Sequence, residues 1–365
     1  MSIFAVQTFG VFLMKKSLMT LALLVATGAY AQSVTLYGVA DVAYNNDVKK
    51  STAGVKTETN DVITNGLSTS RLGFKGDREI ASGLKANFVM EFEVDPSTET
   101  GGIAKTRVGI VGLSGGFGSV SFGRRNTLVK DIENSFDAND GPTAAGYLGD
   151  NARESRRNDV ITYTSPVFSG LSADVQLGFG ATVKETSAAG VVSTTNDGKT
   201  GDSTSLGLSY VNGPVAVKFG TETVKNYSKK VDVAGTSVAV PTALADRKND
   251  ALGVSYDLGV AKLYFVNTRM KQGTEAAKVT FDTNNFGVRV PMGSFTFSAG
   301  ISDGKALLPG QAVKADMSGL QLSVWYALNK DTTVYGVYGK ETIKHASYAT
   351  TSEDKTMLVG VRYKF

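Results

Sequence analysis

The chain of 365 residues contains no cysteine and a single histidine, His345. Without cysteine it can form neither disulfide bonds nor thiolate-based metal or redox centres. One histidine cannot build a histidine cluster around a metal ion. We therefore expect no metal site and no cofactor, and a fold that is stable without covalent cross-links.

Long apolar runs are missing too. After Gln32 no stretch stays apolar over the roughly 20 residues that a membrane-spanning helix needs. Proline is scarce, with 7 residues, whereas glycine is abundant, with 41. A long chain with few helix signatures and many glycines favours an all-β fold.

The first 31 residues read as a leader and not as part of the fold. Met14-Lys15-Lys16 opens a short basic region, Leu18–Val25 is apolar, and Ala29-Tyr30-Ala31 is a small-x-small cleavage site. This pattern is typical of a secretory signal peptide over residues 14–31, cleaved before Gln32. A membrane anchor is the alternative, but the apolar run is short for one. Residues 1–13 precede a complete signal, so we expect Met14 to be the true start.

Strong charge of one sign is also absent. The whole chain has 38 Lys and Arg against 34 Asp and Glu. Loss of Lys15 and Lys16 with the leader brings the net charge of residues 32–365 to about +2. This balance argues against a nucleic-acid partner.

Period-two alternation dominates residues 32–365. In Leu84–Val94 and again in Lys355–Phe365, apolar side chains occupy one face and mostly polar ones the other, as strands require. Sixteen such strands are predicted: Val34–Tyr44, Leu67–Asp77, Leu84–Val94, Ile103–Leu113, Val120–Arg124, Asp159–Thr164, Leu171–Gly180, Leu206–Val211, Val215–Val224, Ala251–Tyr256, Val260–Arg269, Lys278–Val290, Ser294–Ile301, Gly319–Leu328, Thr332–Glu341 and Lys355–Phe365.

Every second connection between these strands is a short turn, and the others are long and polar; Asn45–Gly66 is one of the long ones. Outer-membrane barrels have an even number of strands, short periplasmic turns and long extracellular loops. A soluble β-sandwich, the alternative, has no reason to keep this asymmetry. We therefore predict a transmembrane antiparallel β-barrel of about sixteen strands.

Several motifs resemble those of general diffusion porins of Gram-negative bacteria, of the β-proteobacterial type. They are Ser33-Val34-Thr35-Leu36-Tyr37-Gly38, Ser70-Arg71-Leu72-Gly73-Phe74-Lys75-Gly76, Ser119-Val120-Ser121-Phe122-Gly123-Arg124, Tyr163-Thr164-Ser165-Pro166-Val167-Phe168-Ser169-Gly170 and Val361-Arg362-Tyr363-Lys364-Phe365. The resemblance implies a sixteen-stranded homotrimer in the cell outer membrane. It also implies passive diffusion of ions and small hydrophilic solutes, and a third long loop, residues 126–157, folded into the lumen as a constriction.

The basic side of such a constriction is predicted from alternation. Arg71 and Lys75 alternate with Leu72 and Phe74 and should face the lumen. By the same argument Arg107 faces inward, opposite to Val108 and Ile110. Arg156 shares its parity with Thr162, and Arg124 and Arg125 sit at a strand end where parity is unreliable. The resemblance implies that these arginines form one wall; individually solvated lumen charges are the alternative.

The acidic side is predicted on the loop, which carries Asp131, Glu133, Asp137 and Asp140 before a bend at Gly141-Pro142. A solvated outer loop could have the same composition, but the resemblance favours a position inside the lumen. Strand arginines hold their charge in place and stay ionised, so we predict a moderate anion preference.

The remaining expectations concern partners. The terminal Tyr363 and Phe365 resemble the signal read by the barrel assembly machinery, and outer-membrane lipid and lipopolysaccharide should surround the barrel. The family places the trimer interface on the first strands, where Leu36, Val42, Val108 and Ile110 are candidates. A substrate-specific porin with lumen aromatics such as Tyr37 and Trp325 is one alternative. An outer-membrane enzyme is another, but no nucleophile or catalytic pair is singled out.

Overall fold

We analysed a computed structural model of the chain. It describes residues 33–51, 53–98, 102–139, 148, 155–180, 182–186, 192–196, 201–227, 231–233, 236–238, 245–274, 277–307, 314–344 and 351–365. The predicted leader, Asp140 and His345 lie outside these residues.

The described residues form one large antiparallel sheet, two short hairpins and a single helix. The sheet contains β1 (Ser33–Lys50), β2 (Lys56–Thr64), β3 (Arg71–Ala81), β4 (Leu84–Val94), β5 (Ile103–Gly115), β6 (Gly118–Asn126), β7 (Arg156–Thr164), β8 (Leu171–Gly178), β11 (Ser203–Asn212), β12 (Val215–Tyr227), β15 (Ala245–Asp257), β16 (Lys262–Thr274), β17 (Ala277–Met292), β18 (Phe295–Leu307), β19 (Ala315–Ala327), β20 (Thr332–Lys344) and β21 (Ser352–Lys364). The helix, α2 (Leu128–Phe136), lies between β6 and β7.

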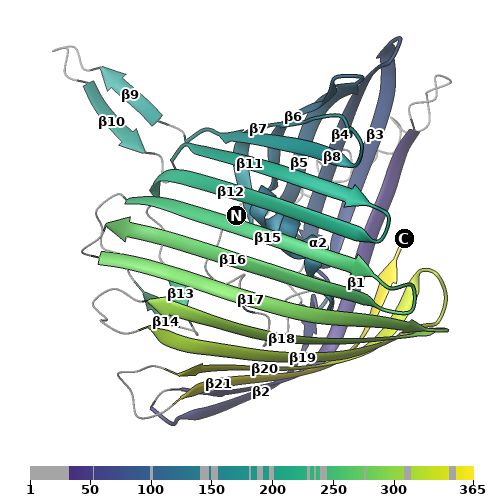
Figure 1. Ribbon diagram of the computed structural model, residues 1–365, viewed down its shortest axis with the longest axis vertical. Coiled ribbons are helices and arrows are strands. Elements are labelled where there is room, and N and C mark those ends of the chain that lie inside the picture. The colour runs from purple at the N-terminus through teal and green to yellow at the C-terminus, as the bar shows by residue number, and fades with distance from the viewer. Residues whose placement is uncertain are drawn as a thin grey trace, which may run out of the picture.

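The sheet closes into a cylinder, as Figure 1 shows. Strand β1 closes it, because β1 pairs with β3 through Ser33–Val39 and with β21 through Val39–Lys50. Strand β2 pairs only with β1, which leaves sixteen described strands in the cylinder. The prediction of a sixteen-stranded antiparallel barrel is therefore confirmed. Closure removes the free strand edges that lipid could not satisfy.

Two short hairpins belong to the long connections. They are β9 (Thr182–Thr186) with β10 (Val192–Asn196), and β13 (Val231–Val233) with β14 (Thr236–Val238). The opposite end of the barrel carries tight turns, and six of the described ones have a glycine with positive φ, at Gly83, Gly118, Gly170, Gly213, Gly259 and Gly293. One connection on the long-loop side is also short, since β16 ends at Thr274 and β17 begins at Ala277. Within the described residues, no helix is long and apolar enough to cross a membrane.

Alternation along the strands sorts the side chains by face. In β21, Val359 is 59% exposed on the outside, whereas its neighbour Leu358 is 1% exposed and points inward. Leu358 is an apolar residue on the face that the sequence pattern marks as polar. It belongs to an inner cluster with Leu67, Trp325 and Tyr335, so part of the lumen face is dry.

The predicted loop Asn45–Gly66 is wrong in most of its length. Strand β1 continues to Lys50 and pairs with β2 as a hairpin. The part of the hairpin beyond Tyr44 is mostly polar on both faces. Side-chain hydrogen bonds join its strands, among them Tyr44 Oη to Asn60 Oδ1 at 2.9 Å and Asn45 Nδ2 to Asp61 Oδ1 at 2.9 Å. A strand that projects into water needs no apolar face, so hydrophobic alternation could not reveal it.

After this hairpin, residues 65–70 lie against the inner wall of the barrel, where they contact Asp41. The Asp41 carboxylate is fully buried and accepts hydrogen bonds from Ser68 N at 2.8 Å, Leu67 N at 3.2 Å and Tyr335 Oη at 2.5 Å. Its neighbour across the β1–β21 ladder is Arg362. Asp41 thus fixes residues 65–70 against the inner wall.

We expect Asp41→Ala to release residues 65–70 from the wall. Two backbone N–H groups lose their acceptor, which costs about 1–3 kcal/mol each when the groups stay buried. Deuterium exchange of Leu67 and Ser68 should therefore rise while the rest of the barrel stays protected. Asp77→Ala is the matched control, because the Asp77 side chain is 56% exposed. Unchanged exchange at Leu67 and Ser68 in the Asp41 variant would contradict this role.

Candidate channel site

The connection between β6 and β7 turns into the barrel and forms α2. The Thr127 side chain caps the helix by accepting a hydrogen bond from Lys130 N at 3.2 Å. Val129, Ile132 and Phe136 recur at intervals of three and four residues, so they share one face of the helix. The sequence reading missed this helix, although its cap and apolar spacing were both visible in the sequence.

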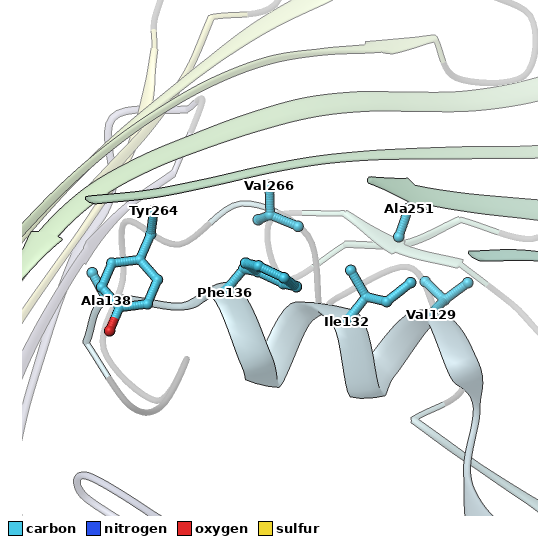
Figure 2. Packing of buried hydrophobic residues seen from close by; sticks show 7 residues of the cluster. All are labelled: Val129, Ile132, Phe136, Ala138, Ala251, Tyr264 and Val266. Atoms are coloured by element: carbon cyan, nitrogen blue, oxygen red, sulfur yellow. The ribbon is translucent and has the colours of Figure 1, made fainter. Parts of the chain in front are cut away.

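This apolar face packs on the inner wall of the barrel, as Figure 2 shows. Val129, Ile132, Phe136 and Ala138 form a buried cluster with Ala251 of β15 and with Tyr264 and Val266 of β16. The helix also contacts β11 and β12. The described segment from Leu128 to Ala138 therefore lies inside the lumen against these strands.

Glycines in the wall provide the space for the helix. A Cβ atom at Gly253 would lie 2.2 Å from the Phe136 ring, and one at Gly220 would lie 2.7 Å from Ile132 Cδ1. Such distances are far below van der Waals contact, so no larger residue fits at either position without movement. The shape of the wall and the position of α2 are matched to each other.

Polar contacts hold the chain that follows α2. Arg289 Nε and Ser298 Oγ donate to the Ala138 carbonyl at 2.9 and 2.7 Å. Further along, Leu148 N donates to Asn285 Oδ1 at 3.1 Å, and Asn285 Nδ2 donates to Leu148 O at 2.8 Å. The described parts of the loop are thus anchored from β11 to β18.

A charged cluster occupies the wall formed by β3 to β7. Arg107 Nε donates to Glu91 Oε1 at 2.7 Å, and Arg107 Nη1 lies 3.6 Å from Glu93 Oε2. Arg71 Nε is 3.9 Å from Glu91 Oε2, and Tyr37 Oη donates to the same oxygen at 3.2 Å. Arg71 and Arg107 therefore share one carboxylate.

Three further basic residues lie around this pair. The Lys75 ammonium is 5.4 Å from the centre of the Tyr37 ring. Arg124 donates to Thr106 O at 2.7 Å and to Asn158 Oδ1 at 2.6 Å. The charge of Arg156 interacts with those of Arg107, Arg124, Glu91 and Glu93. In this cluster four arginines stand against two glutamates.

The alternation argument for Arg107 is wrong, because β5 contains a bulge. Val108 pairs with Glu91 and Ile110 with Val89 in the ladder, whereas the backbone of Arg107 is the extra residue that the ladder with β4 skips. Opposed residues share a face, so Val108 and Ile110 lie on the lumen side with Glu91. A bulge re-aims the side chain of the extra residue, and Arg107 reaches Glu91 and Glu93 from that position.

The parity used for Arg156 fails for a similar reason. Residues 158 and 159 of β7 interrupt the ladder with β6, and Asp159 has a φ of 53°. Beyond this irregularity it is Arg157 that turns inward, where its Nε donates to the buried Glu222 at 2.6 Å. Arg156 lies opposite Asn126 in the ladder. A bulge of this kind has no signature in hydrophobic alternation.

The loop carboxylates point to neighbours other than the arginines of the cluster. Asp131 accepts from Asn126 Nδ2 at 2.7 Å and lies 3.9 Å from Arg125 Nη2. Burial against the wall raises the pKa of the Asp131 carboxyl above its usual range, although Asn126 and Arg125 oppose this shift. Glu133 is buried on α2, and Asp137 accepts from Asn139 N at 2.8 Å.

The sequence analysis predicted a mostly polar face for Leu84–Val94, which carries Glu91 and Glu93, but did not identify these two residues as partners of the arginines. The signal that could have found them is the cross-strand position, since charges of opposite sign meet on adjacent strands. Of the candidate lumen aromatics, Tyr37 bonds Glu91, whereas Trp325 is only 7% exposed. Arg289 covers the Trp325 ring at 4.6 Å, so Trp325 offers little surface to a passing solute.

A closed barrel with an apolar outside, an internal loop and a charged inner wall defines a channel-forming outer-membrane protein. The chain belongs to the family of Gram-negative porins, because the sequence model of that family matches residues 18–346. It is 32% identical over 345 residues to outer membrane porin protein 32 of Delftia acidovorans, covering 88% of each chain. It is 29% identical over 299 residues to the major outer membrane protein P.IB of Neisseria meningitidis, covering 80% of this chain and 84% of the relative.

Among solved structures, the anion-selective porin from Comamonas acidovorans shares the fold with a TM-score of 0.72. The two are 24% identical over 92% of this chain and 100% of that chain. Membership of the family makes the protein a general diffusion channel of the outer membrane and not an enzyme.

Proposed function

We propose that this channel carries a moderate preference for anions. The observation that supports the proposal is the excess of arginines over glutamates in the charged cluster, where Arg71 and Arg107 share the carboxylate of Glu91. Arg124 and Arg156 add positive charge near the same wall. Rings of like charge act on an ion at close range in a narrow passage.

We also propose that residues 126–157 form the constriction. Lys75, Arg71, Arg107, Arg124 and Arg156 would provide its basic side. Asp131, Glu133, Asp137 and Asp140 would provide weaker acidic charge, because Asp131 and Asp137 accept hydrogen bonds from neighbours on or near the loop. The described anchors from Phe136 to Leu148 support a loop that keeps its position during conduction.

The sign of the preference is testable by the reversal potential of single channels under a salt gradient. We expect a reversal potential whose sign indicates anion preference. This preference should weaken at high salt, since the screening length falls to about 3 Å at 1 M. A potential on the cation side would overturn the proposal. Saturable block by one solute would favour the substrate-specific alternative.

We propose a homotrimer that uses the outer surface of the first strands. Leu36 is 54% exposed on this surface, and Val42 lies on the same face of β1. Val108 and Ile110 are not candidates, because the register of β5 turns them inward. A related fold, OmpT of Vibrio cholerae, is described in a trimer form. Light scattering in mild detergent should give three times the mass of one barrel, and a monomer would refute the proposal.

We propose that Tyr363 and Phe365 serve assembly by completing the barrel seam. Phe365 and Gly38 exchange two backbone hydrogen bonds, of 2.8 and 3.1 Å. A Cβ atom at Gly38 would lie 2.3 Å from the Phe365 ring, so the ring covers this glycine. The Tyr363 and Phe365 rings stack at 6.0 Å.

Deletion of Phe365 is therefore expected to reduce the yield of folded protein in the outer membrane. The variant loses the last rung of the β1–β21 ladder and the ring over Gly38. Unheated gels, on which a folded trimer migrates apart from the unfolded chain, provide the measurement. Phe117→Ala, which removes an exposed ring from a turn, is the control. A normal yield without Phe365 would rule out this role.

A further inference from the structure

The lumen face of β4 and β5 carries apolar side chains beside the charged cluster. Val89 lies opposite Ile110, and Val108 lies opposite Glu91, so the three apolar residues point inward on the same face as that glutamate. Each of the three is half-buried and keeps part of its surface open to the lumen. Apolar surface in contact with water is unfavourable unless another apolar group covers it. We call these three residues the apolar strip.

A lysine without an acidic partner borders the apolar strip. Lys75 of β3 lies opposite Val89 in the ladder and therefore shares its face. The Lys75 side chain is exposed, and its ammonium lies 5.4 Å from the centre of the Tyr37 ring. Among the described residues no carboxylate is within ion-pair distance of Lys75, whereas Arg107 donates to Glu91. Lys75 thus remains available to an anion in the lumen.

The neighbouring strands leave room for a solute on this part of the wall. The Tyr37 ring lies flat over Gly73, because a Cβ atom at that glycine would overlap the ring. On the other side, Ile110 is opposite Gly123, which has no side chain to cover it. Neighbouring strands lie about 4.8 Å apart, so the row from Lys75 to Ile110 spans roughly 10 Å over three strands. One small molecule can therefore reach both ends of the row.

We propose that Lys75 and the apolar strip form a low-affinity site for monocarboxylates with an apolar body of about six carbons, a size that suits this row. The carboxylate accepts charge-assisted hydrogen bonds from the Lys75 ammonium. The apolar body lies on Val89 and Ile110, where contact removes apolar surface of both partners from water. The site extends the proposed anion preference, on which it rests, to a class of organic solutes. Chloride and hydroxylated acids have no apolar body and pass the strip without this contact.

The test compares hexanoate with gluconate, which are six-carbon monocarboxylates of different polarity, on single channels of the whole protein in chloride. Hexanoate is expected to lower the chloride conductance. Val89→Ser with Ile110→Ser should weaken this effect about fivefold, since the loss of roughly 40 Å² of apolar contact changes affinity by that factor. The effect of gluconate should stay unchanged in the same variant. Lys75→Gln should also weaken the effect of hexanoate, because the carboxylate loses its partner.

Val55→Ser with Val62→Ser is the matched control. It removes two valines that are 63% and 58% exposed on or beside the β1–β2 hairpin, away from the charged cluster. The effect of hexanoate should be the same in this variant as in the unaltered channel. Benzoate should act as hexanoate does, because the strip contacts apolar surface and not the shape of one solute. The conductance of each variant in chloride alone verifies that the barrel is intact.

Equal effects of hexanoate and gluconate on the unaltered channel would overturn the proposal. So would an effect of hexanoate that persists in the Val89/Ile110 variant, or one that benzoate does not share. The reversal potential in a chloride gradient, measured on the same channels, tests the anion preference separately. A potential on the cation side, together with an effect of hexanoate that depends on Val89 and Ile110, would refute that preference and still support the site.

Discussion

Replacing Arg71 and Arg107 together by serine is expected to move the reversal potential of single channels towards cations. Both side chains lie on the lumen side and share Glu91. Their removal leaves two arginines against two glutamates in the charged cluster. It also exposes Glu91, whose two arginine partners are lost, to passing ions and leaves Glu93 paired with Lys105 at 3.4 Å.

The shift should be large because the two arginines act in two ways at once. They contribute positive charge, and they neutralise carboxylates that would otherwise attract cations. The glutamates are the internal check: adding Glu91→Gln and Glu93→Gln to the double variant should return the potential towards its original value. Charge at the narrow part of a pore acts at close range, so position outweighs the nearly neutral charge of the whole chain.

Arg269→Ser is the matched control, because Arg269 lies on the outer face and pairs with Asp282 at 3.1 Å. It removes one arginine from the same barrel without touching the lumen and should leave the potential in place. No movement in the Arg71/Arg107 variant, or movement towards anions, would show that these arginines do not line the narrow part of the pore.

The second large effect is expected from Gly253→Val, which fills the space under α2. The new side chain would overlap the Phe136 ring, whose atoms lie as close as 2.2 Å to the position of a Cβ. Overpacking costs about 1–3 kcal/mol, whereas undocking α2 would expose Val129, Ile132 and Phe136 at about 1.5–3 kcal/mol each. The helix should therefore move towards the lumen axis and stay docked, and single-channel conductance should fall.

Gly336→Val provides the control, because a Cβ there meets nothing closer than 3.7 Å. Phe136→Ala provides the rescue: combined with Gly253→Val, it restores the space and should return part of the lost conductance. Unchanged conductance in a folded Gly253 variant would mean that the position of α2 does not limit the pore. A drop that Phe136→Ala fails to rescue would trace the effect to the wall and not to the helix.

The sequence by itself determined the number of barrel strands and their approximate positions, because alternation with a period of two is visible in neighbouring residues. The apolar series Met357, Val359 and Val361 is readable without any partner strand, and these residues are exposed on the outside. The alternation of short turns with long polar connections likewise predicted that the short turns lie at one end of the barrel and the long connections at the other. Local patterns of this kind suffice to predict a barrel.

Only the tertiary structure decided which charges meet and where the internal loop rests. The resting place of the internal loop depends on contacts between residues distant in the sequence, such as Arg289 with Ala138. The meeting of charges depends on strand register and on the bulge that leaves Arg107 out of its ladder. The same folding explains Leu358, which breaks the alternation because an inner cluster with Leu67 buries it. The seat of Phe136 at Gly253 is a match of shapes between two segments. The pattern of residues along the chain does not predict this match, because the two segments come together only when the barrel wall has closed around the loop.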